Sequence, residues 1–268
     1  MMQRSFSYGL YWILFYLLKY RRRVVASNLK NSFPLYSKEE IKRIEKGFYK
    51  YLAGLIIETF ILGTFSADQL LKKVKVLNYD LLEAYLSKGT SCFILTAHFQ
   101  NWEYAGTALG VKSNDRVAAV FKPLKNKWFN QWIVKTRTKF GSILVSMHDV
   151  KKILSLKDKQ VAIYMVADQT PSNTISSHWV NFLNQKTAFF HGAEKMAKKM
   201  NIPVFFAHVD GSQTGGYLLH LELITDEPQN TPHGWITEKY AAIVEAKIKA
   251  NPSYWLWSHK RWKLTPDE

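Results

Sequence analysis

The chain has 268 residues, of which 47% are hydrophobic and 15% aromatic, including nine Trp. This length is sufficient for one sizeable domain with a large core. The formal net charge of +16 predicts an anionic partner, which could be a membrane face, a nucleic acid or an acidic protein. Cys92 is the only cysteine, which excludes a disulfide framework and a cysteine-rich zinc site and fits a reducing compartment. It lies in an apolar run, so we predict a core residue.

The first segment with a clear pattern is an apolar run of about 11 residues over 8–18, followed by the basic cluster Lys19-Tyr-Arg-Arg-Arg23. A membrane span needs about 20 residues, so the run is too short. A short aromatic helix that ends in cations is typical of an anchor in the interface of an anionic membrane. The alternative is an ordinary amphipathic helix packed on the domain. A signal peptide is disfavoured because no small-residue cleavage site follows.

Residues 5–66 are predicted to be helical. Ser37-Lys-Glu-Glu40 is a capping box, and apolar residues recur at helical spacing from there to about Gly63. Residues 67–86 are predicted to form a short linking strand and another helix.

From Ser91 onward, apolar β-branched runs alternate with amphipathic segments. The predicted strands are 91–97, 117–121, 142–146, 160–166, 203–209 and 217–225. The predicted helices are 102–110, 126–139, 149–157, 190–200 and 234–250. This alternation predicts an α/β fold with a mostly parallel central sheet flanked by helices. The glycine-rich loop 211–216 predicts that the last two strands form an antiparallel hairpin. We divide the chain into an N-terminal helical region, 1–66, and an α/β region, 67–268, which form one compact unit.

The segment Ala97-His-Phe-Gln-Asn-Trp-Glu103 is the strongest candidate for a site. A histidine held by a carboxylate is the minimum equipment for taking a proton from a hydroxyl. In one continuous helix, residues five apart point about 140° away from each other. His98 and Glu103 can therefore meet, directly or through one water, only if His98 ends a strand and Glu103 lies in the first turn of the next helix. Asn101 is then the N-cap. The alternative is a structural histidine and an unrelated surface glutamate.

Two more polar clusters follow predicted strands, at Lys122 and at Asp168-Gln169. Ligands of open α/β sheets collect at the carboxyl ends of strands, so these clusters should converge with His98 if their strands are neighbours. The alternative for each is a turn residue that caps the next element. The sequence lacks a dinucleotide-binding glycine motif, a phosphate-binding loop and a nucleophile elbow. Its histidines show no tight metal-ligand spacing, so we expect no metal and no cofactor.

The segment Trp255-Leu-Trp-Ser-His-Lys-Arg-Trp-Lys263 interleaves aromatic rings with cations. Three interpretations remain open: internal packing of a guanidinium on an indole, stacking on nucleic acid, and docking at a bilayer interface.

Taken together, these motifs resemble one family, the late acyltransferases of lipid A assembly, within the wider lysophospholipid acyltransferase group. The matching pieces are Arg21-Arg-Arg-Val-Val-Ala-Ser-Asn-Leu29, Ala97–Glu103, Val120-Phe-Lys-Pro-Leu124, Ala167-Asp-Gln169 and Trp255–Lys263. They occur in the family's order and cover nearly the whole chain. The His-x4-acid motif is moderately specific by itself and strong in combination with the others.

The resemblance implies an O-acyltransferase that moves a fatty acyl chain from an acyl carrier protein thioester, or acyl-CoA, to a hydroxyl of a lipid A precursor. By analogy His98 is the general base and Glu103 orients it. The residues assigned to substrate binding are Asn101, Lys122, Arg137, Asp168 and Gln169. The family tends to have Arg at the position of Lys122, and Lys lacks the bidentate fork, which puts a phosphate-binding role in doubt.

The resemblance also implies attachment to the cytoplasmic face of the bacterial inner membrane, peripherally or through the N-terminus. Family members usually begin with a full membrane span, so either the chain is truncated or it attaches peripherally. An acidic carrier would dock on a basic rim, for which the candidates are Lys122, Lys125, Lys127, Lys135, Arg137 and Lys139.

Two other functions remain open: a lysophospholipid acyltransferase that uses acyl-CoA, and a non-catalytic protein that binds anionic lipid or RNA. No RNA-binding signature is present, so a nucleic-acid partner is not expected.

Overall fold

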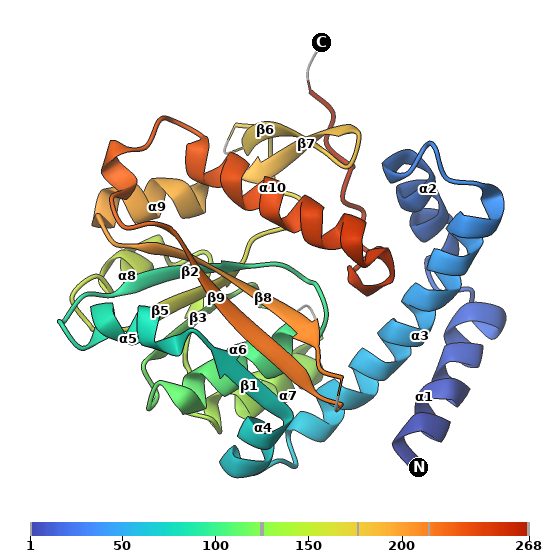
Figure 1. The fold of residues 1–268 in the computed structure, drawn as a ribbon, viewed down its shortest axis with the longest axis horizontal. Coiled ribbons are helices and arrows are strands. Elements are labelled where there is room, and N and C mark those ends of the chain that lie inside the picture. The colour runs from blue at the N-terminus through green and yellow to red at the C-terminus, as the bar shows by residue number, and fades with distance from the viewer. Residues whose placement is uncertain (1, 124–125, 176, 214, 267–268) are drawn as a thin grey trace.

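A seven-stranded sheet forms the centre of the protein, as seen in a computed structural model that describes residues 2–123, 126–175, 177–213 and 215–266 (Figure 1). The strand order is β1-β9-β8-β2-β5-β3-β4, and only the β8–β9 pair is antiparallel. The predicted α/β fold with a mostly parallel sheet is therefore confirmed, as is the antiparallel hairpin.

The strands are β1 (Val74–Leu77), β2 (Cys92–Thr96), β3 (Val117–Phe121), β4 (Ile143–Ser146), β5 (Ala162–Val166), β6 (Ser177–Phe182), β7 (Gln185–Phe190), β8 (Val204–Gly211) and β9 (Tyr217–Thr225). The helices are α1 (Met2–Trp12), α2 (Arg22–Ser32), α3 (Lys38–Leu62), α4 (Ala67–Lys73), α5 (Tyr79–Leu86), α6 (Trp102–Lys112), α7 (Lys127–Thr138), α8 (Val150–Leu154), α9 (Gly192–Met200) and α10 (Trp235–Ala250). A π-helical turn, η1 (Ile13–Leu17), and two 3₁₀ turns, η2 (Pro228–Asn230) and η3 (Pro252–Tyr254), complete the list.

The sequence missed one pair of strands. β6 and β7 form a separate antiparallel ribbon, which lies beside α10 (Figure 1). In addition, β1 pairs with β9 in parallel and forms the edge of the sheet. The β8–β9 hairpin therefore lies inside the sheet, between β1 and β2.

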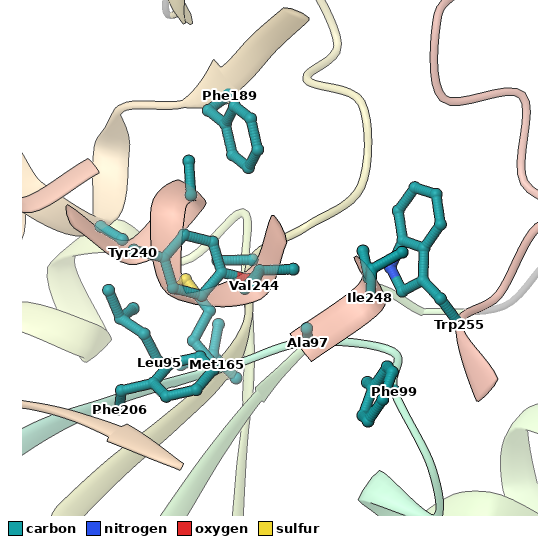
Figure 2. Packing of buried hydrophobic residues seen from close by; sticks show 14 of the residues in the cluster. Leu95, Ala97, Phe99, Met165, Phe189, Phe206, Tyr240, Val244, Ile248 and Trp255 are labelled. Carbon is teal, nitrogen blue, oxygen red and sulfur yellow. The ribbon is translucent and has the colours of Figure 1, made fainter. Parts of the chain in front are cut away.

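Two apolar layers hold the sheet between helices because side chains alternate between its faces. On one face, Leu95, Met165 and Phe206 pack against Tyr240 and Val244 of α10 (Figure 2). The opposite face packs against α4, α5 and α6. Cys92 is fully buried in this second layer, as predicted.

The N-terminal region runs alongside the sheet as three helices, of which α3 is the longest (Figure 1). The predicted capping box is present: the Glu40 N–H donates to Ser37 Oγ at 3.2 Å, and the Ser37 N–H donates to Glu40 Oε2 at 2.8 Å. The α1–η1 segment packs on α3, where Tyr11, Leu14 and Phe15 are buried.

The outer side of the α1–η1 segment is apolar and exposed. Its large exposed side chains are Phe6, Tyr8, Trp12, Ile13, Tyr16, Leu17 and Leu18. One side therefore packs on the domain, as the second interpretation predicted, and the other presents aromatic and aliphatic groups to solvent, so the membrane anchor stays a prediction. Within the described residues, no helix combines the length and the apolar character that crossing a bilayer requires.

Candidate active site

His98 lies two residues beyond the carboxyl end of β2, as its position after an apolar strand predicted. β2 is buried at all five positions and lies between β8 and β5. The imidazole side chain is 17% exposed, so one side of it can be reached from solvent. The sheet thus fixes the backbone of His98 and leaves its imidazole ring at the carboxyl edge of the strands.

Asp168 is the carboxylate that holds His98. β5 is the direct neighbour of β2, and Asp168 follows it at the same edge. Asp168 Oδ1 lies 2.6 Å from His98 Nδ1, and Oδ2 accepts the His98 backbone N–H at 2.9 Å. The predicted convergence of the two polar clusters is confirmed for this pair.

The same carboxylate is tied to the C-terminal segment. The indole N–H of Trp255 donates to Asp168 Oδ2 at 2.7 Å, and Asp168 is only 2% exposed. Burial alone would raise the pKa of Asp168, but the charge of His98 and the hydrogen bonds from His98 and Trp255 hold that pKa below its usual value. Asp168 therefore stays ionised near neutral pH and accepts a hydrogen bond from the N–H at Nδ1 of His98.

The second ring nitrogen of His98 faces Gln169. Gln169 Nε2 lies 3.1 Å from His98 Nε2, and Gln169 is exposed. If Nδ1 carries the proton shared with Asp168, Nε2 is an acceptor and the Gln169 amide is its donor. Trp102 packs edge-on against the imidazole, with ring centroids 4.8 Å apart.

Glu103 lies in the first turn of α6, as predicted, but its carboxylate does not contact the His98 ring. Arg137 donates to both of its oxygens, through Nε at 3.1 Å and a terminal nitrogen at 2.7 Å, and the indole N–H of Trp102 donates at 3.1 Å. Both ring nitrogens of His98 have other partners. The prediction of a direct His98–Glu103 hydrogen bond is therefore wrong, and contact through one water stays a prediction.

The Glu103–Arg137 pair is largely buried, with side chains 12% and 21% exposed. Burial would raise the pKa of Glu103, but the Arg137 guanidinium holds that pKa below its usual value. Glu103 therefore remains charged in the helix that follows His98.

Asn101 is the N-cap of α6, as predicted: its Oδ1 accepts the Tyr104 N–H at 2.9 Å. Its Nδ2 donates to Glu58 Oε2 of α3 at 2.8 Å, and the Tyr217 hydroxyl donates to the same oxygen. Asn101 is completely buried. We predicted no role for Glu58, although a carboxylate in the apolar second half of α3 was a usable signal.

A cavity of about 340 Å³ lies beside Glu58, between α1 and α3. It is lined by Ser7, Tyr8, Tyr11, Lys50, Gly54, Glu58 and Lys73. The Glu58–Asn101 hydrogen bond connects its wall to the start of α6, and the Tyr51 hydroxyl of α3 donates to the Gln100 carbonyl at 2.7 Å. An aromatic and cationic cavity is thus connected, through Glu58, to the helix that follows His98.

The basic rim predicted around α7 is partly used inside the protein. Arg137 pairs with Glu103, and the Lys139 ammonium donates to the carbonyls of Gly63 and Phe65. Lys122, Lys127 and Lys135 are exposed. Lys125 lies outside the described residues.

The aromatic and basic C-terminal segment is mainly internal packing. Trp255, Trp257 and Arg261 are fully or almost fully buried, and the Arg261 guanidinium lies 4.4 Å from the Phe189 ring centroid. The alternatives of docking on nucleic acid or a bilayer through these three side chains are therefore wrong.

The comparisons with known proteins identify the family. Residues 2–264 match the family described as bacterial lipid A biosynthesis acyltransferase. The chain is an acyltransferase, and it belongs to this bacterial lipid A biosynthesis family.

Two curated relatives extend the match over most of their own length. The lipid A biosynthesis palmitoleoyltransferase of Escherichia coli (strain K12) is 23% identical over 256 residues, which are 93% of this chain and 81% of the relative. The lipid A biosynthesis acyltransferase of Shigella flexneri has the same identity and coverage.

Proposed function

We propose that this enzyme transfers a fatty acyl chain from an acyl carrier protein thioester to a hydroxyl of a lipid A precursor, with His98 as general base. The observation that supports this most is the His98–Asp168 pair, with a 2.6 Å contact at Nδ1 and Nε2 on the accessible side. The family match supports the reaction class and the acceptor class.

The proposed reaction begins with Nε2 of neutral His98 accepting the proton of the acceptor hydroxyl. The oxygen attacks the thioester carbonyl, and Asp168 stabilises the imidazolium that forms. The tetrahedral intermediate collapses with release of the thiolate, which takes the proton from His98. No covalent intermediate on the enzyme is needed, and the N-terminal end of α6 supplies a positive dipole for the developing oxyanion.

The neighbours of His98 have supporting roles in this proposal. Gln169 lies at Nε2 of His98, on the side from which the acceptor hydroxyl would approach. It is therefore placed to contact that substrate. Glu103 acts on the base through Trp102, which it hydrogen-bonds and which packs on the imidazole. Asn101 acts indirectly, as the buried cap of α6.

The substrate contacts are assigned by charge and position. The cavity beside Glu58 carries Lys50 and Lys73, which suit the anionic head of the lipid acceptor. Lys122, Lys127 and Lys135 are the proposed rim for the acidic carrier protein. The exposed apolar side of α1–η1 attaches the enzyme peripherally to the cytoplasmic face of the inner membrane.

The test uses purified His98→Ala and Asp168→Asn enzymes with acyl carrier protein thioester and a lipid A precursor. Each variant should lose a factor of about 10² to 10⁴ in kcat while its thermal unfolding stays close to that of the wild type. Asn in place of Asp168 donates to Nδ1 and so puts the ring proton on Nε2, which disables the base.

The matched control is His233→Ala, an exposed histidine in the loop before α10. Its turnover should equal that of the wild type. Normal turnover in folded His98→Ala would return His98 to a structural role, and efficient use of acyl-CoA with no response to the carrier protein would favour the lysophospholipid alternative.

A further inference from the structure

Two histidines and an aspartate converge on one face of the β8–β9 hairpin, where His208 lines a small pocket together with Ala97 and Phe99, the chain neighbours of His98. His208 of β8 and His220 of β9 are register partners, and their rings stack at 4.5 Å with 5° between planes. Asp210 lies two residues after His208 and so points to the same face. Its Oδ2 is 3.4 Å from His208 Nε2 and 3.5 Å from His220 Nε2.

We propose that His208, Asp210 and His220 bind one Zn²⁺ ion. Ligand atoms about 2.0–2.1 Å from a tetrahedral zinc are about 3.3 Å from one another, close to the two observed separations. All three ligand atoms lie within 4.8 Å of one another. The His220 side chain is 27% exposed, so its ring has room to rotate out of the stack and bring its Nε2 to the third ligand position. Two imidazoles and one carboxylate form a donor set that suits zinc.

The surroundings of His208 support a ligand role. Its Nδ1 is buried and has no hydrogen-bond partner, although Glu222 Oε1 lies 3.4 Å away. Metal-bound histidines usually donate their other ring N–H to a carboxylate. With zinc on Nε2, Nδ1 must carry the proton, and Glu222 is the carboxylate in position to accept it.

The competing arrangement is an ion pair without metal, because Lys247 of α10 has its ammonium 3.6 Å from Asp210 Oδ2. The two arrangements predict opposite effects of removing Lys247. If zinc binds, Lys247→Met should tighten it, because a competing cation is lost. If the cluster is only an ion-pair network, Lys247→Met leaves an unpaired carboxylate and no saturable zinc binding.

The sequence predicted no metal because the ligands have no tight spacing. His208 and His220 are twelve residues apart and meet only through the cross-strand register. The proposed site lies in β8, the strand next to β2, and would fix the hairpin there. It is independent of the acyl transfer proposed above.

The experiment is a calorimetric Zn²⁺ titration of the full chain, purified without a polyhistidine tag and treated with chelator. We expect one Zn²⁺ per chain and a zinc-dependent rise in Tm. His220→Ala and Asp210→Asn should each weaken binding by at least about tenfold, and Lys247→Met should strengthen it. His233→Ala is the control and should bind as the wild type does.

Thermal unfolding without metal identifies any variant that fails to fold, and His220→Ala and Asp210→Asn check each other. The proposal is overturned if neither wild type nor Lys247→Met binds zinc saturably. It is also overturned if folded His220→Ala and Asp210→Asn bind as tightly as wild type, or if His233→Ala alone abolishes binding.

Discussion

At the scale of single residues, the candidate active site contains two carboxylates with different partners. Asp168 is hydrogen-bonded to the proposed base, whereas Glu103 is neutralised by Arg137. Sequence spacing pointed to Glu103 because it lies in the same motif as His98. The contact with Asp168 depends on β5 lying beside β2, which linear spacing does not encode.

Removing Arg137 tests how much the neutralisation of Glu103 contributes to the stability of the folded protein. Arg137→Met should lower the free energy of unfolding by about 2–4 kcal/mol, since it leaves the Glu103 carboxylate buried without its cation. Glu103→Gln together with Arg137→Met should cost less than Arg137→Met alone. Urea unfolding of the two single variants and the double variant gives the coupling between them.

The deficit of Arg137→Met should also shrink as the pH falls. Without Arg137, burial raises the pKa of Glu103, so the carboxyl takes up a proton in the folded state at a higher pH than in the unfolded chain. Additive costs across the cycle, or a deficit that grows toward acid pH, would contradict the pairing.

At the scale of elements, α10 is fixed at its start by a buried carboxylate. Glu194 of α9 accepts the N–H groups of Gly234 and Thr237, at 2.7 and 2.9 Å, and the Thr237 hydroxyl at 2.7 Å. Burial would raise the pKa of Glu194, but these hydrogen bonds hold it below its ordinary value of 4.5. The helix that covers the face beside β2 therefore depends on a charged side chain.

Glu194→Gln should cost about 1–3 kcal/mol of unfolding free energy at neutral pH. A carboxyl with a depressed folded pKa stabilises the protein above its unfolded pKa and loses that contribution as the pH falls through the folded value. The difference in unfolding free energy between wild type and variant should therefore narrow below about pH 4.5. Urea unfolding across pH measures this, with Glu245→Gln, in an ordinary pair with Lys249, as control. A gap that does not change with pH would sink the idea.

The sequence predicted α3 and the sheet strands from β2 to β9 within a few residues, because their apolar periodicities and caps are local signals. It missed the β6–β7 ribbon because residues 177–190 are only partly apolar and the turn between the two strands, Leu183-Asn184, contains no glycine. It also did not predict the hydrogen bond from Trp255 to Asp168, because that contact joins residues 87 positions apart. Local sequence patterns do not predict which polar side chains far apart in the chain form hydrogen bonds with each other.

At the scale of the whole molecule, exposed apolar side chains gather on α1–η1, at the side of the molecule far from α5 (Figure 1). Leu17→Glu with Leu18→Glu should reduce partitioning onto anionic liposomes by at least about tenfold, since each leucine removes apolar area from water. Flotation with Leu81→Glu of α5 as a control measures this. If the Leu17/Leu18 double variant and Leu81→Glu lose liposome partitioning equally, α1–η1 is not the attachment site.

Docking of the acidic carrier protein is also a property of one side of the molecule. Lys127 and Lys135 lie on α7, which follows the carboxyl end of β3, whereas Lys157 and Lys159 lie just before the amino end of β5. Charge reversal of Lys127 and Lys135 should slow association with the carrier about tenfold and flatten its salt dependence. Stopped-flow binding measures both, and Lys157→Glu with Lys159→Glu should leave the rate unchanged.

If turnover with acyl-CoA falls as much as turnover with the carrier, the rim does not dock the donor.

The segment around Trp255 also has a consequence for the order in which the candidate site assembles during synthesis. Phe99 forms an antiparallel bridge with Trp255, the Leu256 N–H donates to the His98 carbonyl at 3.1 Å, and Trp255 holds Asp168. A growing chain on the ribosome places His98 and Asp168 in β2 and β5 long before this segment emerges. We expect Asp168 and the His98 carbonyl to lack these contacts until Trp255 and Leu256 have left the exit tunnel, so the proposed site reaches its final arrangement only at the end of synthesis.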